Sequence, residues 1–491
     1  MTDILDRDLA SIQQARTLIR AAKIAQERLA TYTQEQVDQI CAAMAAAGAA
    51  HAQGLAQMAV DETGMGRVED KTLKNIFASE TVWKSIERQR TVGIIGEYPD
   101  QGITEVGVPM GVIAALIPTT NPTSTAIFKA IIAVKAGNAL VVSPHPSAKN
   151  CTMAAVRLID QAGRAAGLPE GTISCLDDPT MEATHTLMTH EDVALILATG
   201  GGAMVKAAYS SGKPAIGVGP GNGPAYIERT ADIPAAVRRI LDSKTFDNGT
   251  ICASEQSVVT EDVIREQVIE EFKRQGAYFL NPSEKDQVGA ILMRASGTMN
   301  PAIVGRTAVR IAEMAGIQVP ETTRVLIGFE TEVGERYPYS REKLCPVLGF
   351  YSTPDWHTAC EQCICILKHE GAGHTMTIHS RDEAVIKEFA LKKPVSRLLV
   401  NTPASLGGVG ATTNLQPSLT LGCGAIGGNA SSDNIGPLNL INIRRVARGT
   451  QELSDLRPAS PQSSSASLST TIDTERLVRM VIERLMSKSV T

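Results

Sequence analysis

Several features that would assign a chain to a special class are missing from this sequence. Its 47 lysines and arginines nearly balance its 52 aspartates and glutamates, for a net charge of −5. No broad basic field is therefore present to bind nucleic acid or an anionic membrane. Apolar runs such as residues 112–118 are far shorter than the roughly 20 residues of a membrane span. Residues 1–6 carry acids where a secretory signal carries lysines, so we expect no such signal.

The cysteine content and the catalytic motifs narrow the choice further. Nine cysteines, an odd number spread over 491 residues, do not form the pattern of a disulfide scaffold. We expect a soluble cytoplasmic protein with reduced thiols. The chain contains no Gly-x-Ser-x-Gly, no Walker-type Gly-Lys-Ser/Thr and no His-Glu-x-x-His. These absences exclude most hydrolase and phosphoryl-transfer functions.

What the chain does contain is an ordered succession of helices and apolar strands. Up to about residue 90, apolar residues at three- and four-residue spacing predict consecutive helices. Beyond that, short apolar runs at 112–117, 139–142 and 194–198 alternate with helical segments at about 123–135 and 148–166. Continuous apolar strands separated by helices predict a parallel sheet covered on both faces, with nucleotides bound at the carboxyl ends of its strands.

The same patterns predict two α/β lobes. We expect N-terminal helices and a dinucleotide-binding domain over 1–224, to which 425–452 return, and a second domain over 225–424. The Gly-, Asn- and Pro-rich stretch 401–449 ends in a strand-like piece at 439–443. A loop segment of this length inside a compact chain is more often functional than idle.

The C-terminal segment differs from the rest of the chain. Residues 453–470 form a Ser/Pro-rich linker, and 471–491 predict a short amphipathic helix with Ile472, Leu477 and Val481 on its apolar stripe. Such a helix on a flexible tether can hide its stripe only by docking. It docks either on its own protein or a sister subunit, or as an address peptide on another protein.

Among the residues that could carry chemistry, Cys252 stands out by its context. It follows an Asn-Gly turn in the segment 248–256, where backbone amides at a loop junction can lower a thiol pKa and stabilise an oxyanion. On local sequence alone, a small buried cysteine remains the alternative.

Two other segments lie at the ends of predicted strands. Residues 199–202, Thr-Gly-Gly-Gly, join a strand to a helix, which lets a pyrophosphate approach backbone amides, although many such turns contain glycine only for its conformation. Asn121 follows the strand at 112–117, where its amide can donate to an oxyanion or form an Asx-turn before Pro122.

A cluster of cysteines and histidines near residue 360 raises the question of a metal. Structural zinc sites usually need two ligand pairs at regular spacing, and only one cluster is present. Residues 356–367 also predict a single helix on which these positions face different sides. We therefore expect no metal site from Cys360, Cys363, Cys365, His357, His369 and His374.

Taken in order, the motifs resemble those of the aldehyde dehydrogenase superfamily, and more narrowly its CoA-acylating branch. The resemblance covers about residues 10–450, and so many motifs in one order make coincidence implausible. The motifs are PTTNP (118–122), SPHP (143–146), TGGG (199–202), GPGNGP (219–224), NGTICASEQ (248–256), EKLCP (342–346), NTPAS (401–405), PSLTLGCG (417–424), GGN (427–429) and NIGP (434–437).

The resemblance implies roles for three catalytic residues. Cys252 is expected to attack the aldehyde and form a thiohemiacetal, whose oxyanion Asn121 and the Cys252 amide hold. Hydride transfer to nicotinamide then leaves an acyl-thioester on the sulfur. His374 is typical of the branch, and either assists the CoA half-reaction or is structural.

The resemblance also implies a cofactor site. The turn at 200–202 is expected beneath the pyrophosphate, and Glu342 at the nicotinamide ribose. Ser143 stands where hydrolytic members usually carry a lysine, and no basic residue obviously awaits a 2′-phosphate, which favours NAD over NADP. The cofactor-binding residues are Thr119, Ser143, His145, Pro146, Thr199, Gly200, Gly201, Gly202, Val218, Gly219, Glu342 and Leu344.

One departure from the hydrolytic members points to the second substrate. They carry a glutamate base in the segment aligned with 218–224, and this chain has no acid there. Water attacks a thioester slowly without a base, whereas a thiolate is a strong nucleophile. The expected reaction therefore converts a short-chain aldehyde, acetaldehyde or propionaldehyde, to acyl-CoA with NAD and coenzyme A.

Two alternatives remain beside this expectation: a hydrolytic (semi)aldehyde dehydrogenase that releases a carboxylic acid, and an inactive scaffold of the same fold. By the same resemblance we expect a homo-oligomer, dimer or tetramer, in which strands at about 104–108 and 439–443 pair with a neighbouring subunit. The tail is similar to encapsulation peptides, so residues 471–488 are expected to bind a shell protein and locate the enzyme inside a bacterial microcompartment.

Overall fold

The computed structural model describes residues 6–457 and 473–486. It separates into two compact units, one of residues up to Glu97 with Glu105–Arg445, the other of Tyr98–Thr104 with the residues from Val446 onward. Within the described ranges, no helix is both long and apolar enough to span a membrane.

The first unit begins with the predicted run of helices. Asp6 caps the first helix by accepting from two backbone amides, and Thr33 and Gln36 form a capping box at the start of the second. Gly64, in the left-handed conformation, ends the third. A short π-helix at Phe77–Thr81 separates the fourth helix from the fifth. The helices are α1 (Arg7–Leu29), α2 (Gln34–Ala50), α3 (Ala52–Thr63), α4 (Val68–Ile76) and α5 (Val82–Ile86).

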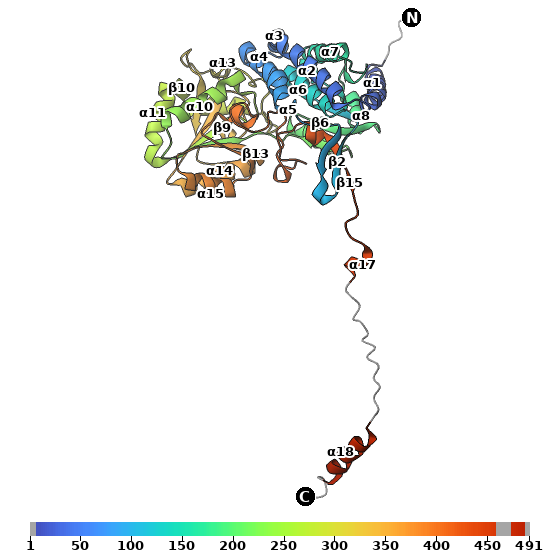
Figure 1. Cartoon of the computed structure of the whole chain (residues 1–491). Coiled ribbons are helices and arrows are strands. Elements are labelled where there is room, and N and C mark those ends of the chain that lie inside the picture. The colour runs from blue at the N-terminus through green and yellow to red at the C-terminus, as the bar shows by residue number, and fades with distance from the viewer. Residues whose placement is uncertain (1–5, 458–472, 487–491) are drawn as a thin grey trace. The chain divides into compact units, whose positions relative to one another are not determined.

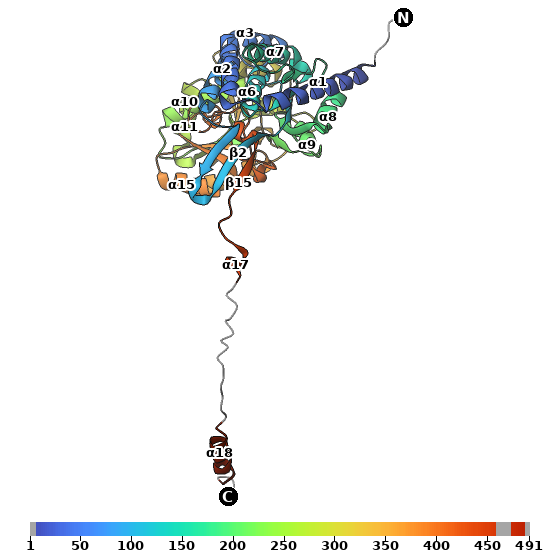
Figure 2. The same cartoon turned by 45° about the vertical axis from the view of Figure 1, so that its right-hand side comes forward.

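A five-stranded parallel sheet follows, in the order β5-β4-β3-β6-β7. Alternate residues of its central strands face opposite layers: Ile113 packs with α2, α6 and α7, while Val112 packs with α1 and α8. Figure 2 shows α1 lying along α8 on that second face. The elements are β3 (Val112–Leu116), α6 (Pro122–Lys135), β4 (Ala139–Ser143), α7 (Lys149–Ala165), β5 (Ile173–Cys175), α8 (Met181–Thr189), β6 (Val193–Ala198), α9 (Gly202–Tyr209) and β7 (Ala215–Gly217).

A seven-stranded parallel sheet forms the second lobe, in the order β10-β11-β12-β9-β8-β13-β14. Helices α10 and α11 cover one face and α14 and α15 the other (Figure 1). The strands are β8 (Gly223–Ile227), β9 (Glu255–Glu261), β10 (Ala277–Phe279), β11 (Val325–Phe329), β12 (Val347–Thr353), β13 (Gly373–His379) and β14 (Val395–Val400). The helices are α10 (Ile233–Thr245), α11 (Arg265–Arg274), α12 (Pro282–Leu292), α13 (Ala308–Met314), α14 (Trp356–His369), α15 (Glu383–Lys392) and α16 (Ala404–Gly408).

The predicted small strand element is a three-stranded sheet of β1 (Gly93–Tyr98), β2 (Ile103–Pro109) and β15 (Ile441–Ala447), in that order. The strand expected at 439–443 starts two residues later, because Pro437–Leu440 form a 3₁₀ turn. Pro437 favours a turn start of this kind, since its φ is fixed and it lacks an N–H.

The predicted C-terminal helix is present as α18 (Thr474–Met486), and the first residues of the predicted linker form a short helix, α17 (Leu453–Leu456). The remaining linker residues, 458–470, and the predicted helix residues 471–472 and 487–491 lie outside the described ranges. The domain boundary expected at 224/225 stays a prediction. In the first unit, β8 begins at Gly223.

Candidate active site

A cavity of about 670 Å³ is lined by the loops that precede strands β8, β9 and β12 of the seven-stranded sheet and by the carboxyl ends of the strands of the five-stranded sheet. Ligand sites in parallel α/β proteins form at such strand ends. All the residues predicted from the sequence to bind the cofactor line this cavity, together with Cys252 and Asn121. His374 does not line it, because its side chain is fully buried.

Cys252 lies in the loop between a 3₁₀ turn, Phe246–Gly249, and strand β9. Asp247 and Asn248 in that turn have φ values of 49° and 53°, in the left-handed region. Burial raises the pKa of the Cys252 thiol to about 12, and the nearby Glu342 adds to this effect, while Arg397 opposes it. The sulfur therefore rests as a neutral thiol and needs a base.

His374 supplies a candidate base behind the sulfur. Its Nε2 lies 3.2 Å from Cys252 Sγ, and its Nδ1 lies 3.0 Å from the Thr375 hydroxyl. Burial lowers the pKa of His374 to about 3, and the charge of Arg397 lowers it further. The imidazole is therefore neutral and has a nitrogen available to accept the thiol proton. The contact places His374 beside the sulfur, and its role, in the CoA half-reaction or in the structure, stays a prediction.

Arg397 holds the far end of this chain of contacts. Its Nε donates to the Thr375 hydroxyl at 3.1 Å, and its other nitrogens donate to Asn434 Oδ1 and to the carbonyls of Ser432 and Gly422. No carboxylate pairs with it among the described residues. A buried guanidinium without an acid leaves its positive charge available to stabilise a thiolate nearby.

Asn121 begins helix α6, directly after β3. Its side chain makes no capping bond to the helix, so the alternative of an Asx-turn is not what the structure contains. Instead Nδ2 donates to Thr250 O at 3.3 Å and to Thr120 Oγ1 at 3.2 Å. The amide N–H group is thus directed at the loop that carries Cys252, as an oxyanion donor requires.

The turn at 199–202 fits a dinucleotide. It connects β6 to α9, and a Cβ added at Gly201 or Gly202 would meet nothing within 4 Å. The Thr199 hydroxyl is buried without a hydrogen-bond partner in the described part of the chain. Open backbone at a helix start and an unpaired hydroxyl provide donors for a pyrophosphate.

The adenosine end of the predicted site shows how Ser143 is used. Its hydroxyl lies 2.9 Å from Thr184 Oγ1 on α8, and His145 Nδ1 accepts from the Ser147 amide. Burial lowers the pKa of His145. Arg7, which the sequence reasoning missed, also lines the cavity, but its guanidinium is bound at 2.6 and 2.7 Å to both oxygens of Asp178.

Glu342 lies beside the thiol and is held by backbone. Its Oε1 accepts from the Gly221 amide at 2.8 Å, and its own amide donates to Glu370 at 2.8 Å. Burial raises the pKa of Glu342 to about 8, and the charge of Glu370 contributes in the same direction. At neutral pH this carboxyl is therefore mostly protonated, which makes it a poor base for activating water.

The segment without an acid, 218–224, is pressed against the nucleophile loop. A Cβ added at Gly221 would lie 1.8 Å from the Cys252 carbonyl oxygen, so a side chain cannot be accommodated there. The backbone of Gly221 instead binds Glu342. Close packing of two backbones thus excludes a side chain at Gly221, and the other positions of the segment carry no acid.

Sequence reasoning missed a buried ion cluster that supports Asn121. Lys71 and Lys74 on α4 both bind Asp247 Oδ2, at 2.9 and 2.5 Å, with side chains at most 3% exposed. Lys74 also donates to Asn121 Oδ1 at 2.6 Å. The one local signal is two lysines three residues apart on a short helix, which is more typical of a solvated face.

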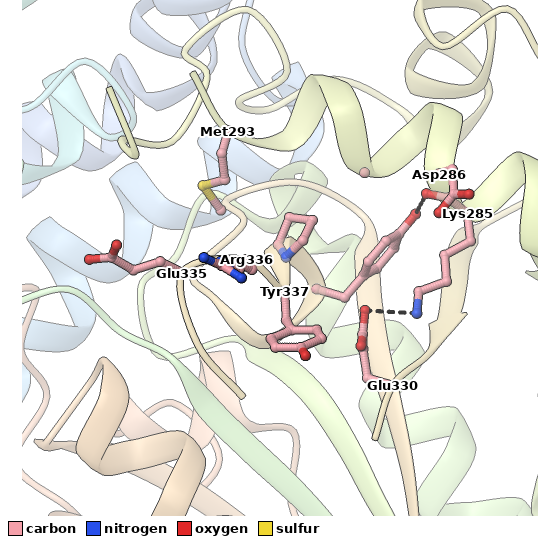
Figure 3. A pocket seen from close by; sticks show the side chains of 10 residues that line it. Lys285, Asp286, Met293, Glu330, Glu335, Arg336 and Tyr337 are labelled. Carbon is pink, nitrogen blue, oxygen red and sulfur yellow. Dashed lines mark hydrogen bonds and ion pairs between the residues drawn. The ribbon is translucent and has the colours of Figure 1, made fainter. Parts of the chain in front are cut away.

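A second hollow of about 500 Å³ lies beside α12 and the segment 335–339 (Figure 3). Two of its side chains are already paired: Lys285 Nζ lies 2.9 Å from Glu330, and Tyr339 donates to the Lys285 carbonyl. Cysteine and histidine are both missing from its lining, so it lacks a nucleophile and a base of the kind found in the larger cavity.

The cysteines near residue 360 are spread around α14. Cys360 and Cys363 are buried in the apolar core beneath the helix, whereas Cys365 is exposed. This matches the expectation that the positions face different sides.

Comparison with known proteins adds a family to this geometry. The model of the aldehyde dehydrogenase family matches residues 2–336. A bifunctional aldehyde-alcohol dehydrogenase of Escherichia coli K12 is 47% identical over 450 residues, which are 91% of this chain and 50% of that protein. The chain thus spans about half the length of such bifunctional relatives. An acetylating succinate-semialdehyde dehydrogenase of Clostridium kluyveri is 38% identical, over 89% of this chain and 96% of that protein.

Solved structures match over nearly their whole length. An acetylating aldehyde dehydrogenase of Geobacillus thermoglucosidasius is 51% identical with a TM-score of 0.91, covering 93% of this chain and 100% of that one. A propionaldehyde dehydrogenase of a Clostridium phytofermentans fucose-utilisation microcompartment is 30% identical with a TM-score of 0.80. The match covers 88% of this chain and 97% of that one. A propionaldehyde dehydrogenase of Rhodopseudomonas palustris, solved with bound CoA and an acylated cysteine, is 27% identical with a TM-score of 0.79. The match covers 88% of this chain and 97% of that one.

Proposed function

This chain belongs to the aldehyde dehydrogenase family, and we propose that it is a CoA-acylating member that converts a short-chain aldehyde to acyl-CoA with NAD. The observation that carries the proposal is the acid-free segment 218–224, which packs at Gly221 directly against the Cys252 backbone. The acetylating relatives and the CoA-bound propionaldehyde dehydrogenase support the same reaction.

The reaction begins at Cys252. The sulfur bonds to the aldehyde carbon while the thiol proton moves toward His374 Nε2, 3.2 Å away. Because thiol and imidazole both rest uncharged, proton transfer accompanies the attack. The carbonyl oxygen becomes an alkoxide, which the Asn121 Nδ2 group and the Cys252 amide stabilise by hydrogen bonds. The product of this step is a thiohemiacetal on the sulfur.

The cavity then serves the redox step. The cavity would hold a nicotinamide, which would supply the hydride acceptor that converts the thiohemiacetal to an acyl-thioester on Cys252. The amides of 200–202 and the Thr199 hydroxyl would bind the pyrophosphate, and Arg7, a cation that lines the same cavity, is paired with Asp178. We therefore propose NAD as the coenzyme, which a comparison of kcat/KM for NAD and NADP tests.

The final step transfers the acyl group to a thiol. Glu342, bound by the Gly221 amide and mostly protonated at neutral pH, does not activate water. His374 releases to solvent the proton it took from Cys252 and can then accept the proton of the CoA thiol, which it returns to the Cys252 sulfur when acyl-CoA leaves. Attack of the CoA sulfur on the thioester carbon releases acyl-CoA and returns the Cys252 thiol.

The decisive experiment measures NADH and identifies the acyl product with and without CoA, across aldehydes of two to five carbons. We expect NADH formation beyond one equivalent per subunit only with CoA, and acyl-CoA as the product. Carboxylate formed without CoA would instead establish the hydrolytic alternative. A lack of NADH under both conditions, equal to the Cys252→Ala baseline, would establish an inactive scaffold. The acetylating and propionaldehyde-oxidising relatives favour two or three carbons.

The partners of the protein are proposed on separate grounds. Helix α18 exposes Leu477, Val478, Val481 and Ile482 by 50% or more, although leucine, valine and isoleucine are among the residues most often buried. The microcompartment relative supports docking of this stripe on a shell protein, and therefore a location inside such a compartment. The edge strand β15 supports assembly into a dimer or tetramer by pairing with a neighbouring subunit, whereas β2, which was expected to take part, lies between β1 and β15 and has no free edge.

A further inference from the structure

We propose that Lys74 is a positioning residue, which fixes the Asn121 amide with its N–H group toward the nucleophile loop. The inference rests on the proposed function only in that Asn121 must stabilise an oxyanion on the Cys252 adduct.

The argument starts from the chemistry of an ammonium group, which donates three hydrogen bonds and accepts none. Lys74 Nζ donates to Asp247 Oδ2 at 2.5 Å, to Asn121 Oδ1 at 2.6 Å and to Thr250 Oγ1 at 2.9 Å. These three bonds use every donor it has. The atom of the Asn121 amide that faces Lys74 must therefore be the oxygen.

The orientation of the amide follows. With its oxygen bound to Lys74, the amide nitrogen is the atom 3.3 Å from the Thr250 carbonyl, two residues before Cys252. The flipped amide would set an N–H group against an ammonium and an oxygen against a carbonyl oxygen, and both contacts are repulsive. Lys74 thus selects the one orientation in which Asn121 is a donor at the thiol.

Asp247 holds Lys74 in place. Its Oδ2 also accepts from Lys71 at 2.9 Å and from the Thr250 hydroxyl at 2.7 Å, while its Oδ1 accepts from the Arg67 amide. Burial alone would raise the pKa of Asp247, but the two lysines outweigh it and keep the carboxylate charged. A buried ion cluster is a weak source of stability, so a functional reason for keeping it is expected.

Lys71 provides a matched control. It is as buried as Lys74 and binds the same Asp247 oxygen, but it donates to the Thr120 carbonyl instead of to Asn121. Replacing either lysine by methionine removes one charge from the same cluster. Only the replacement of Lys74 also releases the Asn121 amide.

The test is a double-mutant cycle on aldehyde oxidation, with kcat, KM and thermal unfolding measured for each variant. Removing an oxyanion donor typically costs about 100- to 1,000-fold in kcat, which we expect for Asn121→Ala. Lys74→Met should lose about 10- to 100-fold in kcat with little change in KM, because a misoriented donor acts only in the transition state. Lys74→Met/Asn121→Ala should be within about twofold of Asn121→Ala, since the two residues act as a unit.

The controls decide between positioning and structure. The loss in kcat caused by Lys71→Met, whatever its size, should multiply with the loss caused by Asn121→Ala. Lys74→Arg should recover most of the kcat that Lys74→Met loses. If Lys74→Met does not fold, the cycle is run with Lys74→Gln, which stays polar beside Asp247 but is one atom too short for Asn121. Full activity of the Lys74 variant, or a loss that multiplies with Asn121→Ala, would overturn the inference.

Failure of the proposed function would be recognised separately. If wild-type protein produced carboxylate without CoA, the CoA reaction would be wrong. The cycle would still test Lys74, because the same oxyanion forms before the thioester is released in either reaction.

Discussion

At the scale of single residues, Cys252 and His374 form an uncharged pair, because both are buried and burial disfavours the charged form of each. This differs from enzymes that keep a resident thiolate beside an imidazolium. An uncharged thiol is protected from reaction until an aldehyde is bound next to it. The base is therefore needed in every turnover.

Replacing His374 by alanine tests that requirement. We expect the single-turnover rate of NADH formation to fall about 100-fold or more at pH 7. In this variant the rate should rise tenfold per pH unit from 7 to 9, because the thiolate fraction grows tenfold per unit below the thiol pKa of about 12. Wild type should lack this slope. A variant rate that stayed level with pH, above the Cys252→Ala background, would assign the base elsewhere.

The buried His379 should make the free energy of unfolding depend on pH, without affecting activity. Burial lowers the pKa of His379 to about 3, and neither ring nitrogen has a hydrogen-bond partner in the described residues. Below the unfolded pKa of about 6.5, the unfolded chain binds a proton that the native one does not, so stability falls as the pH falls. At pH 5 this imidazole costs about 2 kcal/mol.

His379→Leu should therefore gain stability over wild type on acidification. The difference between the two proteins in the free energy of unfolding should grow by about 2 kcal/mol from pH 7 to pH 5, with turnover unchanged. Urea unfolding at several pH values measures it. A difference independent of pH would mean that the ring titrates normally in the native protein.

The residues of the site differ in how far sequence could predict them. Cys252, Asn121 and the turn at 199–202 lie in local motifs, and the structure brings them to one cavity. Lys74 and Asp247 are 173 positions apart and neither lies in a motif that indicates burial. The role of Arg397 could not be predicted from the sequence either, because its contact with His374 runs through the Thr375 hydroxyl on a neighbouring strand. Such contacts depend on tertiary packing.

At the scale of elements, the segment from β7 to β8 packs closely against the loop that carries Cys252. Gly221→Ala introduces a Cβ 1.8 Å from the Cys252 carbonyl oxygen, which forces two backbones apart. Because a displacement of 1 Å at a reacting group can cost about 100-fold in rate, we expect kcat to fall about 10- to 100-fold.

The matched control for this substitution is Gly54→Ala on α3. Nothing lies within 4 Å of a Cβ added there, and alanine favours the helix. Gly54→Ala should keep wild-type kcat and unfold at the same or a higher temperature. Wild-type kcat in Gly221→Ala would show that the loop tolerates displacement and that the contact does not position Cys252.

The elements themselves were largely predictable. The strands expected at 112–117, 139–142 and 194–198 are β3, β4 and β6, because continuous apolar runs between helices have few other solutions in a parallel sheet. The strand order was not predictable, since β6 pairs with β3 through a crossover and β8 is inserted between β9 and β13. Those pairings are decided by how the helices pack on both faces.

At the scale of the whole molecule, α18 is dispensable for catalysis if its role is docking. Deleting residues 471–491 should leave kcat within about twofold of wild type, because every group of the proposed mechanism lies before residue 400. Co-sedimentation with microcompartment shells should be lost. The measurement compares activity and shell association of the two proteins.

A second experiment, with substitutions in place of the deletion, separates the role of the apolar stripe from that of the helix as a whole. Val478→Glu/Ile482→Glu adds charge to the exposed apolar stripe, whereas Arg479→Glu changes a charge on the polar side. Only the first should abolish shell association. Loss of soluble protein in the stripe variant or in the deletion would instead indicate that the helix docks on its own subunit or a sister subunit.

The ion cluster around Asp247 has a mechanical consequence for the whole first unit. It joins helix α4 to the loop that carries the sulfur, through side chains that are at most 3% exposed. Pulling the two apart would strand three charges in an apolar interior, which is among the least favourable events in a protein. If large cosubstrates enter and leave the cavity as proposed, we therefore expect other parts of its lining to move. Cys252 and Asn121 should keep their positions relative to each other.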